Sequence, residues 1–436
     1  MLLHEFLAQQ EGSTTIGELF EVTKKPRGLD LSPRAQIPFV PMDAIPQGGA
    51  FTPRYDMKPS TESGTGTYFE KCDVLVGKIT PSFENGKQAL VCDLPSEFGF
   101  ATTEVIPLRP KGADRDRRLL FYYLLHPDIR SYVAGRMEGA TGRKRVPEDV
   151  LLGLPFPAFD SEEEQAISNC LSRIRSSINI EGALGDRLAS LKRTAMRELF
   201  SRGLRGEAQK ESEIGPIPES WTLVEFSQVR RRLQYGTSIR CSSELSPHPV
   251  LRIPNIAPGR VDASDLKYAT VSEKEASRHR LEDGDIIFIR TNGVLERLGC
   301  CAVFDGDPEG ALFASYLIRA QPDRTKLNPY FAAHFYSSQV GTALVAGRAT
   351  PAADGKYNLN TGIIDSLPLP LPHSLIEQGE IVSILDAIDA KINLHKRKQA
   401  LLEELFRALL HKLMTSEVRV ADLDLSALEA NCEVAT

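Results

Sequence analysis

Leu154-Pro155-Phe156-Pro157 is followed by Ser161-Glu162-Glu163-Glu164-Gln165 and then by a long amphipathic run that ends near Phe200. The same order returns at Leu367-Pro368-Leu369-Pro370, which is followed by Ser374-Leu375-Ile376-Glu377-Gln378 and a similar run to Met414. The two proline motifs lie 213 residues apart in a chain of 436, and one inserted residue after the glutamine makes the offset 214 in the runs. A repeat of this length indicates a tandem duplication in which each half ends in a long helix.

The two runs have the features of helices that need a partner. Ser161 with Glu164, and Ser374 with the Glu three residues later, predict capping boxes at both starts. Each run holds about 40 residues, roughly 60 Å of helix, with one apolar stripe. The chain supplies two such stripes, so we expect the helices to pack on each other as a coiled coil.

Polar residues interrupt the apolar stripe in the middle of both runs. They are Glu181 and Gly185 in the first, and His395 and Gln399 in the second. In an antiparallel pair these polar centres would meet and fix the register. The alternative is that glycines, which disfavour helix, merely kink the first helix.

Composition limits the class of protein. The hydrophobic content of 42% and charged content of 25% are those of a soluble globular protein. Neither a signal peptide nor an apolar run of about 18 residues is present, so we expect a cytoplasmic protein without a membrane partner. Seven cysteines without a Cys-x-x-Cys pair predict reduced thiols rather than a disulfide framework or a zinc site. The net charge of −6 argues against non-specific coating of nucleic acid but allows a local basic face.

Catalytic motifs are weak or missing. The chain lacks a Walker A loop, Gly-x-Ser-x-Gly and His-Glu-x-x-His. Asn328-Pro329-Tyr330 is one proline short of an amino-methyltransferase motif and is typical of a helix start. Asp323 with Asp354-Gly355-Lys356 fits only a loose pattern for a Mg²⁺-dependent nuclease. We therefore predict a non-catalytic chain that binds neither a cofactor nor a metal.

Basic and amide residues occur in loops of both halves. Arginine and lysine can position phosphates, and arginine, asparagine and glutamine can read base edges. Each cluster taken alone is more often a solvated face; their occurrence in both halves is what favours DNA binding. The candidates are Lys78, Arg143, Lys144 and Arg145 in the first half, and Thr237, Ser238, Arg252, Asn255, Arg290, Asn292, Lys356, Tyr357 and Asn358 in the second.

Several segments together resemble one family. Beside the two Leu-Pro-x-Pro…Glu-Gln segments, they are Ile-Pro-Glu-Ser-Trp at 217–221, Leu-Arg-Ile-Pro-Asn-Ile at 251–256 and Leu-Glu-Asp-Gly-Asp-Ile-Ile at 281–287. The arrangement is similar to the specificity subunit of type I restriction-modification systems over nearly the whole chain except its tail. The first half departs from the pattern, because it starts at Ile16-Gly17-Glu18-Leu19 and has Cys72 where the second half has Gly284.

The resemblance implies an α+β fold with a pseudo-two-fold internal repeat. Two target recognition domains would be joined by two long helices that form an antiparallel coiled coil. The expected parts are domain 1 at residues 1–157, the first spacer helix at 158–204, domain 2 at 205–370, the second spacer helix at 371–415 and a tail at 416–436.

The resemblance also implies a division of labour. Each domain would read one half of a bipartite site in double-stranded DNA. The helices would set the gap and dock two methyltransferase (modification) subunits, which a motor-nuclease (restriction) subunit joins; S-adenosylmethionine, ATP and Mg²⁺ would belong to those partners. The residues expected to serve as spacer and docking positions are Gln165, Leu171, Ile174, Ile178, Gln378, Leu385, Ile388 and Ile392.

One inference comes from the residues themselves. The loop at Arg143-Lys144-Arg145 differs from Lys356-Tyr357-Asn358 at the matching place, so the two half-sites should differ and the target should be asymmetric. A spacer of roughly 60 Å places the half-sites within about one to two helical turns of DNA. The main alternative is a bivalent scaffold for protein partners, and the second is an enzyme built on the weak nuclease pattern.

Overall fold

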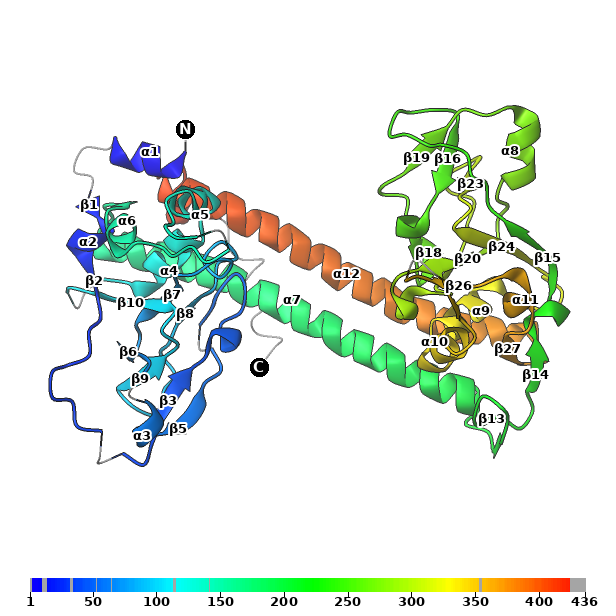
Figure 1. Cartoon of the computed structure of the whole chain (residues 1–436), viewed down its shortest axis with the longest axis horizontal. Coiled ribbons are helices and arrows are strands. Elements are labelled where there is room, and N and C mark those ends of the chain that lie inside the picture. Colours follow the sequence, from blue (N-terminus) through cyan, green and yellow to red (C-terminus); the bar gives the residue numbers. More distant parts are fainter. Residues whose placement is uncertain are drawn as a thin grey trace. The chain divides into compact units, whose positions relative to one another are not determined.

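The computed structural model describes residues 2–9, 14–31, 34–51, 53–63, 65–112, 115–140, 142–352 and 355–423. The chain divides into two compact units. Unit 1 comprises residues 1–182 and 397–436, and unit 2 comprises residues 183–396 (Figure 1). Asp354 of the nuclease pattern and residues 424–436 of the expected tail lie outside the described residues. Among the described residues, none of the helices is long and apolar enough to cross a membrane.

Unit 1 contains two main β-sheets, drawn in blue to cyan in Figure 1. Their inward side chains are almost wholly apolar, as expected for strands buried on both faces. The five-stranded sheet has the order β2 (Phe20–Val22), β10 (Val105–Pro110), β7 (Val74–Gly77), β8 (Gln88–Leu90) and β4 (Ala50–Phe51). The four-stranded sheet has the order β5 (Asp56–Pro59), β3 (Gln36–Val40), β9 (Phe98–Ala101) and β6 (Thr67–Glu70), and β1 (Thr14–Thr15) pairs with β11 (Pro155–Phe156).

The helices of unit 1 cover the five-stranded sheet and bring it to the long helices. Asp116 caps α4, because its side chain accepts a hydrogen bond from the amide of Arg118. His126 caps α5, because its ring accepts a hydrogen bond from the amide of Asp128. The helical segments are α1 (Leu3–Ala8), α2 (Ile16–Leu19), η1 (Met42–Ala44), α3 (Ser60–Ser63), α4 (Arg117–Leu125), α5 (Pro127–Ala134), α6 (Glu148–Leu152) and, after the last long helix, η5 (Val420–Asp422).

Unit 2 repeats this plan with more strands. Its six-stranded sheet has the order β15 (Arg230–Tyr235), β24 (Leu317–Pro322), β20 (Ile286–Ile289), β22 (Cys301–Val303), β18 (Gly259–Val261) and β17 (Ile256–Ala257). Two three-stranded sheets are β19 (Lys267–Ala269), β16 (His248–Leu251) and β23 (Leu312–Phe313), and β21 (Thr291–Asn292), β26 (Tyr357–Asn358) and β25 (Thr350–Pro351). Two strand pairs complete it: β12 (Gln209–Lys210) with β13 (Ile217–Pro218), and β14 (Thr222–Glu225) with β27 (Pro368–Leu371).

The shorter helices of unit 2 follow the same order as those of unit 1. Asn328 caps α9 and Pro329 occupies its first turn, as expected for the helix start that the sequence indicated. The segments are η2 (Phe226–Gln228), η3 (Ile253–Asn255), α8 (Glu273–His279), η4 (Leu295–Arg297), α9 (Pro329–Tyr336), α10 (Gln339–Ala346) and α11 (Thr361–Asp365).

The strand pairings confirm the internal repeat. β7 pairs antiparallel with β10 in unit 1, and β20 pairs antiparallel with β24 in unit 2. Each unit also has an equivalent parallel pair, which is β3 with β9 in unit 1 and β16 with β23 in unit 2. The Leu-Pro-x-Pro stretch is a strand in both units, β11 and β27, and it pairs with an early strand of its own half. The α+β fold with an internal repeat is therefore confirmed.

The two long helices are α7 (Ser161–Arg202) and α12 (Leu375–Met414), and they run antiparallel within each unit. In unit 1, Arg175 lies 5.9 Å from the ring of Phe406, and further along α7 Glu181 forms a 2.6 Å ion pair with Lys398. In unit 2, Lys192 forms a 2.6 Å ion pair with Asp389. Later residues of α7 thus meet earlier residues of α12, as expected for an antiparallel coiled coil.

The polar middle of the helices is partly as predicted. Glu181 pairs with Lys398, and the side chain of Gln399 lies over Gly182 in unit 1. α7 continues through Gly182 and Gly185, so the glycines do not end the helix. Whether these contacts fix the register is still a hypothesis.

Two local predictions were wrong at the helix starts. Asp160, not Ser161, caps α7, because its carboxylate accepts from the amide of Glu163. Ser374 does cap α12 by accepting from the amide of Ile376, but Glu377 turns away and accepts from the indole of Trp221. Glu164 likewise bonds Arg115 and the amide of Asp116, so neither glutamate is engaged as the predicted capping boxes require.

The repeat register at the helix starts also differs from the prediction. Glu164 accepts from the backbone amide of Asp116, just before α4, and Gln378 accepts from the amide of Asn328, just before α9. The equivalent of Gln378 is thus Glu164 and not Gln165. The inserted residue precedes the helix, because α7 begins at 161 and α12 at 375, already 214 residues apart.

Cysteine and tail predictions also need correction. Cys72 and Cys92 are paired as a disulfide, so reduced thiols were a wrong expectation for these two. Cys170, Cys241, Cys300 and Cys301 are free. After α12, Val420 and Leu423 pack against the apolar core of unit 1, so this part of the expected tail is structured.

Candidate nucleic-acid interface

The unit 1 candidates meet around the end of β7. Lys78 follows the strand directly, and its carbonyl accepts from the amide of Val146 at 2.8 Å. The amide of Thr80 donates to the carbonyl of Lys144 at 3.0 Å, and Arg145 makes bridges to Ile79 and Glu138. The four residues that we name the basic loop surface are therefore joined by backbone pairing: Lys78, Arg143, Lys144 and Arg145.

The basic loop surface is open to solvent and carries excess positive charge. Arg143, Lys144 and Arg145 are exposed, and Lys78 is half-buried. Arg145 has a weak 3.4 Å contact with Glu104, a geometry that contributes little at a solvated surface. Four cations beside one such carboxylate suit contact with phosphates.

The unit 2 candidates meet in the same backbone frame. The carbonyl of Arg290, which follows β20, accepts from the amide of Leu359 at 2.7 Å. β21 pairs with β26, which places Thr291 opposite Asn358 and Asn292 opposite Tyr357. β25 then pairs with the other edge of β26, as Glu138 does with Arg145 in unit 1. Arg290 and Asn358 thus take the places of Lys78 and Arg145.

Two exposed tyrosines that the sequence interpretation missed lie in this frame. The guanidinium of Arg290 stacks over the ring of Tyr235 at 4.8 Å and donates to the carbonyl of Ser315 at 3.3 Å. Tyr316, whose carbonyl accepts from the amide of Arg290, is 56% exposed. We name the group the tyrosine–asparagine surface: Tyr235, Arg290, Asn292, Tyr316, Tyr357 and Asn358.

The tyrosine–asparagine surface can read bases in ways that a purely basic surface cannot. Its aromatic rings offer faces for stacking and its amides offer paired donors and acceptors. Lys356 and Ser238 are exposed near this surface. Thr237 is buried, and its carbonyl accepts a hydrogen bond from the amide of Ser315. The signal in the sequence was available, because Tyr235 ends a strand directly before the Gly-Thr-Ser loop.

Two candidates have roles inside the protein instead. Asn255 is 1% exposed, and its side-chain amide donates to the carbonyls of Asp262 and Asp265. Arg252 forms a 2.9 Å ion pair with Asp265. These side chains stabilise the turn around η3. Asn255 is too deeply buried to contact DNA.

The candidate docking positions on the helices divide by exposure. Gln165 is exposed and Ile388 is half-buried. The others are buried, and all of them except Gln378 and Ile392 belong to the apolar cores of the units. Buried side chains can act as spacer residues but present little surface to another subunit. They are Leu171, Ile174, Ile178, Gln378, Leu385 and Ile392.

A buried carboxylate anchors the start of each strand that leads to these surfaces. Asp73 accepts from the amide of Glu70 at 2.8 Å before β7, and Asp285 accepts from the amide of Glu282 at 2.9 Å before β20. Burial raises the pKa of both carboxyl groups to about 6. Matching carboxylates in matching turns again reflect the duplication.

Comparison with known proteins agrees with this duplicated geometry. Residues 248–404 match the type I restriction modification DNA specificity domain, and this region holds Arg290, Asn292, Tyr357 and Asn358. The structure is similar to a type I restriction-modification S subunit from M. genitalium, with a TM-score of 0.55 and 16% identity over 92% of this chain and 95% of that one. The chain is therefore similar to type I specificity subunits, with the family match confined to residues 248–404.

Curated type I specificity subunits match part of this chain at higher sequence identity. The putative MjaX specificity subunit of Methanocaldococcus jannaschii is 28% identical over 48% of this chain and 49% of its own length. The EcoKI specificity subunit of Escherichia coli is 25% identical over 59% of this chain and 57% of its own. The chain therefore spans only about half the length of these two relatives.

Proposed function

We propose that this chain is the DNA-recognition subunit of a type I restriction-modification complex. Unit 1 reads one half of a bipartite duplex target and unit 2 reads the other, and the chain itself is not catalytic. The observation that carries the proposal is the shared backbone frame, in which Lys78 and Arg145 of unit 1 are replaced by Arg290 and Asn358 of unit 2. One scaffold with two different sets of contacting groups is suited to reading two different half-sites.

The two surfaces differ in the kind of contact they offer. The basic loop surface supplies lysine and arginine, which bind phosphates. Its arginines can also bind guanine. The tyrosine–asparagine surface adds amides that can bind adenine and rings that contact bases. The half-sites should therefore differ, and the target should be asymmetric.

Exposed apolar side chains on α12 support docking of further subunits. In unit 1, Leu401 is 57% exposed and Leu405, one turn further on, is 41% exposed. In unit 2, Ile376 is 74% exposed and Ile384 is 42% exposed. Large aliphatic side chains that are exposed to water on one helix favour binding of another protein surface. We propose that two modification subunits dock here, that a restriction subunit joins them, and that these partners supply S-adenosylmethionine, ATP and Mg²⁺ chemistry.

Mapping of methylated adenines in a host with active partner subunits tests the proposal. Deletion of the gene should remove methylation from one gapped, asymmetric motif. An unchanged pattern of methylation would refute DNA recognition by this chain and would favour a bivalent scaffold for other proteins.

Variants then assign the half-sites. Alanine at Arg143, Lys144 and Arg145 should alter or weaken methylation in one half of the motif, and alanine at Asn292 and Asn358 should act on the other half. Arg205→Ala, an exposed arginine in the turn after α7, serves as the control and should leave both halves unchanged. If both sets of variants act on the same half, the assignment of one half-site to each unit is wrong.

A further inference from the structure

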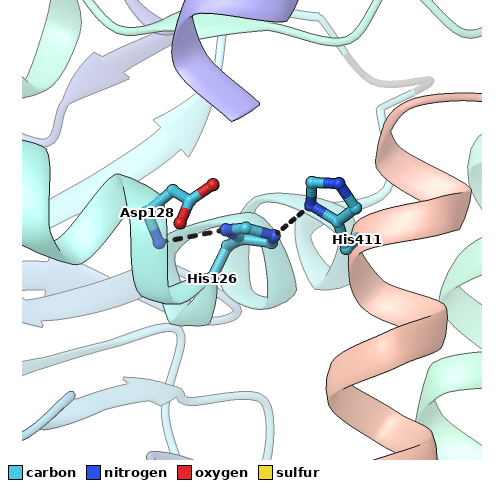
Figure 2. Close-up of side chains that lie close together, drawn as sticks. All are labelled: His126, Asp128 and His411. Atoms are coloured by element: carbon cyan, nitrogen blue, oxygen red, sulfur yellow. Dashed lines mark hydrogen bonds between the residues drawn. The ribbon is translucent and has the colours of Figure 1, made fainter. Parts of the chain in front are cut away.

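Two histidines far apart in the sequence meet in unit 1. His126 is both the last residue of the α4 turn and the cap of α5, and His411 lies in the last turn of α12. The Nε2 atom of His126 lies 3.1 Å from Nδ1 of His411 (Figure 2). Their separation of 285 positions in the sequence explains why sequence spacing gave no sign of this pair.

A carboxylate completes the group. In Figure 2 Asp128 lies next to the His126 ring, with His411 on the other side of that ring, and one ligand atom from each of the three residues lies within 4.8 Å of the others. One oxygen of Asp128 accepts from the amide of Leu3 at 3.0 Å, which fixes the carboxylate at the start of α1. His126 is 3% exposed, and Asp128 and His411 are half-buried, so an ion could reach the group from the surface.

We propose that His126, Asp128 and His411 form a binding site for one transition-metal dication of the Zn²⁺ type. Two imidazoles and one carboxylate are a ligand set that suits Zn²⁺, with a fourth position left for water. Zn–N bonds of about 2.0–2.1 Å at a tetrahedral angle place two ligand nitrogens about 3.3 Å apart. The 3.1 Å between the two ring nitrogens is close to that separation, so these two atoms need little change in distance to hold an ion.

Metal binding can leave the net charge of His126 unchanged, because the ring proton can move from one nitrogen to the other. Asp128 donates its amide hydrogen to Nδ1 of His126 at 3.2 Å. The neutral ring therefore carries its proton on Nε2 and donates it to His411. When the ion binds, this proton moves from Nε2 to Nδ1, the amide gives up its bond, and the ion takes the place between the rings.

A second cluster in unit 2 shows why the unit 1 group is the better site. His334, Asp386 and Asp389 also lie within 4.8 Å of one another. There, however, Asp386 pairs with Arg260 at 3.3 Å and Asp389 pairs with Lys192 at 2.6 Å. A metal would have to displace both cations. Among the ion pairs of the described residues, Asp128 has neither a lysine nor an arginine partner, so its charge is available.

A bound ion would act as a clamp within unit 1. It would join the start of α5 to the end of α12 and, through Asp128, to the start of α1. The inference goes beyond DNA recognition and does not depend on it. Because ligands that bind only the folded state stabilise it, the ion should raise the unfolding temperature of unit 1.

The test uses the full-length chain without an affinity tag, stripped with a chelator and titrated with Zn²⁺. We expect one ion per chain by elemental analysis after dialysis, and Co²⁺ should give the visible d–d bands of a tetrahedral site with nitrogen ligands. His411→Gln keeps an acceptor for His126 but lacks the imidazole. It should weaken binding by more than about 100-fold, beyond the loss that removal of an outer-shell partner causes. Asp128→Asn should also weaken binding.

His334→Gln, in the competing cluster of unit 2, is the matched control and should keep the full affinity. Hydrogen exchange in α5 and the end of α12 shows whether each variant is folded. Failure of the wild-type chain to take up one ion, or equal uptake by a folded His411→Gln variant, would overturn the proposal. In that case the two histidines form only a hydrogen-bonded contact.

Discussion

Asp73 and Asp285 occupy equivalent places in the two units, but only Asp285 has a buried arginine beside it. Arg319 Nη1 lies 3.4 Å from the Asp285 carboxylate, and both side chains are almost fully buried. Arg319 faces Ile287 across the sheet; at the matching pair in unit 1, Pro107 faces Leu75. The duplicated turn was therefore kept, while the buried arginine was not; Arg109, the arginine near Asp73, is partly exposed and pairs with Glu21 and Glu70.

This difference predicts how stability depends on pH. Burial raises the pKa of Asp73 to about 6, above its unfolded value of about 3.9. Between these values the folded state holds a proton that the unfolded state lacks, so the free energy of unfolding falls as pH rises from about 4 to 6. Asp73→Asn removes this cost and keeps the acceptor for Glu70. We expect unit 1 to gain up to about 3 kcal/mol at pH 7 and almost nothing at pH 4.

Hydrogen exchange of β7 and β10 in urea measures this effect in unit 1. The matched variant is Asp285→Asn, followed by fluorescence of Trp221, the single tryptophan of the chain, which is buried in unit 2. Its gain should be smaller, because Arg319 loses its carboxylate partner. A larger gain at Asp285 than at Asp73 would contradict this account.

Gln378 and Gln165 provide a direct test of the repeat register. Gln378 is fully buried, accepts from the amide of Asn328 and donates to the carbonyls of Lys326 and Pro372. Gln378→Ala leaves these backbone groups without partners and should cost about 2–3 kcal/mol. Gln165→Ala changes an exposed residue and should cost less than about 0.5 kcal/mol. Urea unfolding checks both, and equal losses would restore the register that the sequence indicated.

Local patterns in the sequence were sufficient for much of the fold. The repeated Leu-Pro-x-Pro strand, the amphipathic runs and the apolar strands are set by neighbouring residues, so they could be predicted. Contacts between side chains that lie far apart in the sequence depend on three-dimensional packing and could not be predicted. Asn255 resembles a DNA-reading amide in the sequence but is buried against a turn, and Tyr235 gains its role only because Arg290 lies over it. The contact of His126 with His411 joins residues 285 positions apart in the sequence.

The glycines in the middle of α7 predict an easy gain in stability. A methyl group on Gly182 would lie 3.4 Å from Gln399 Nε2, an ordinary contact, and one on Gly185 would meet no atom within 4 Å. Alanine favours helix over glycine by about 1 kcal/mol. Gly182→Ala and Gly185→Ala should each stabilise the chain by about that amount in thermal or urea unfolding. If Gly182→Ala alone is destabilising, close approach to Gln399 is what requires the glycine.

The two candidate surfaces predict different losses of DNA binding, and this prediction rests on the proposed function. Lys144 is exposed and its side chain suits a phosphate, so Lys144→Ala should weaken specific and non-specific binding alike. It should also reduce the slope of log K against log salt by about 1. Arg290 is held by Tyr235 and Ser315, and Arg290→Ala should cost about 1–3 kcal/mol for the cognate site only.

Fluorescence anisotropy with cognate duplexes in the presence of the modification subunit measures both effects. For Arg290→Ala, duplexes altered at single positions should show relaxed selectivity in one half-site and unchanged selectivity in the other. Arg205→Ala is the control and should behave as the wild type. A uniform loss across all duplexes for Arg290→Ala would mean that this arginine binds phosphate, and base reading in unit 2 would then rest on Asn292, Asn358 and the tyrosines.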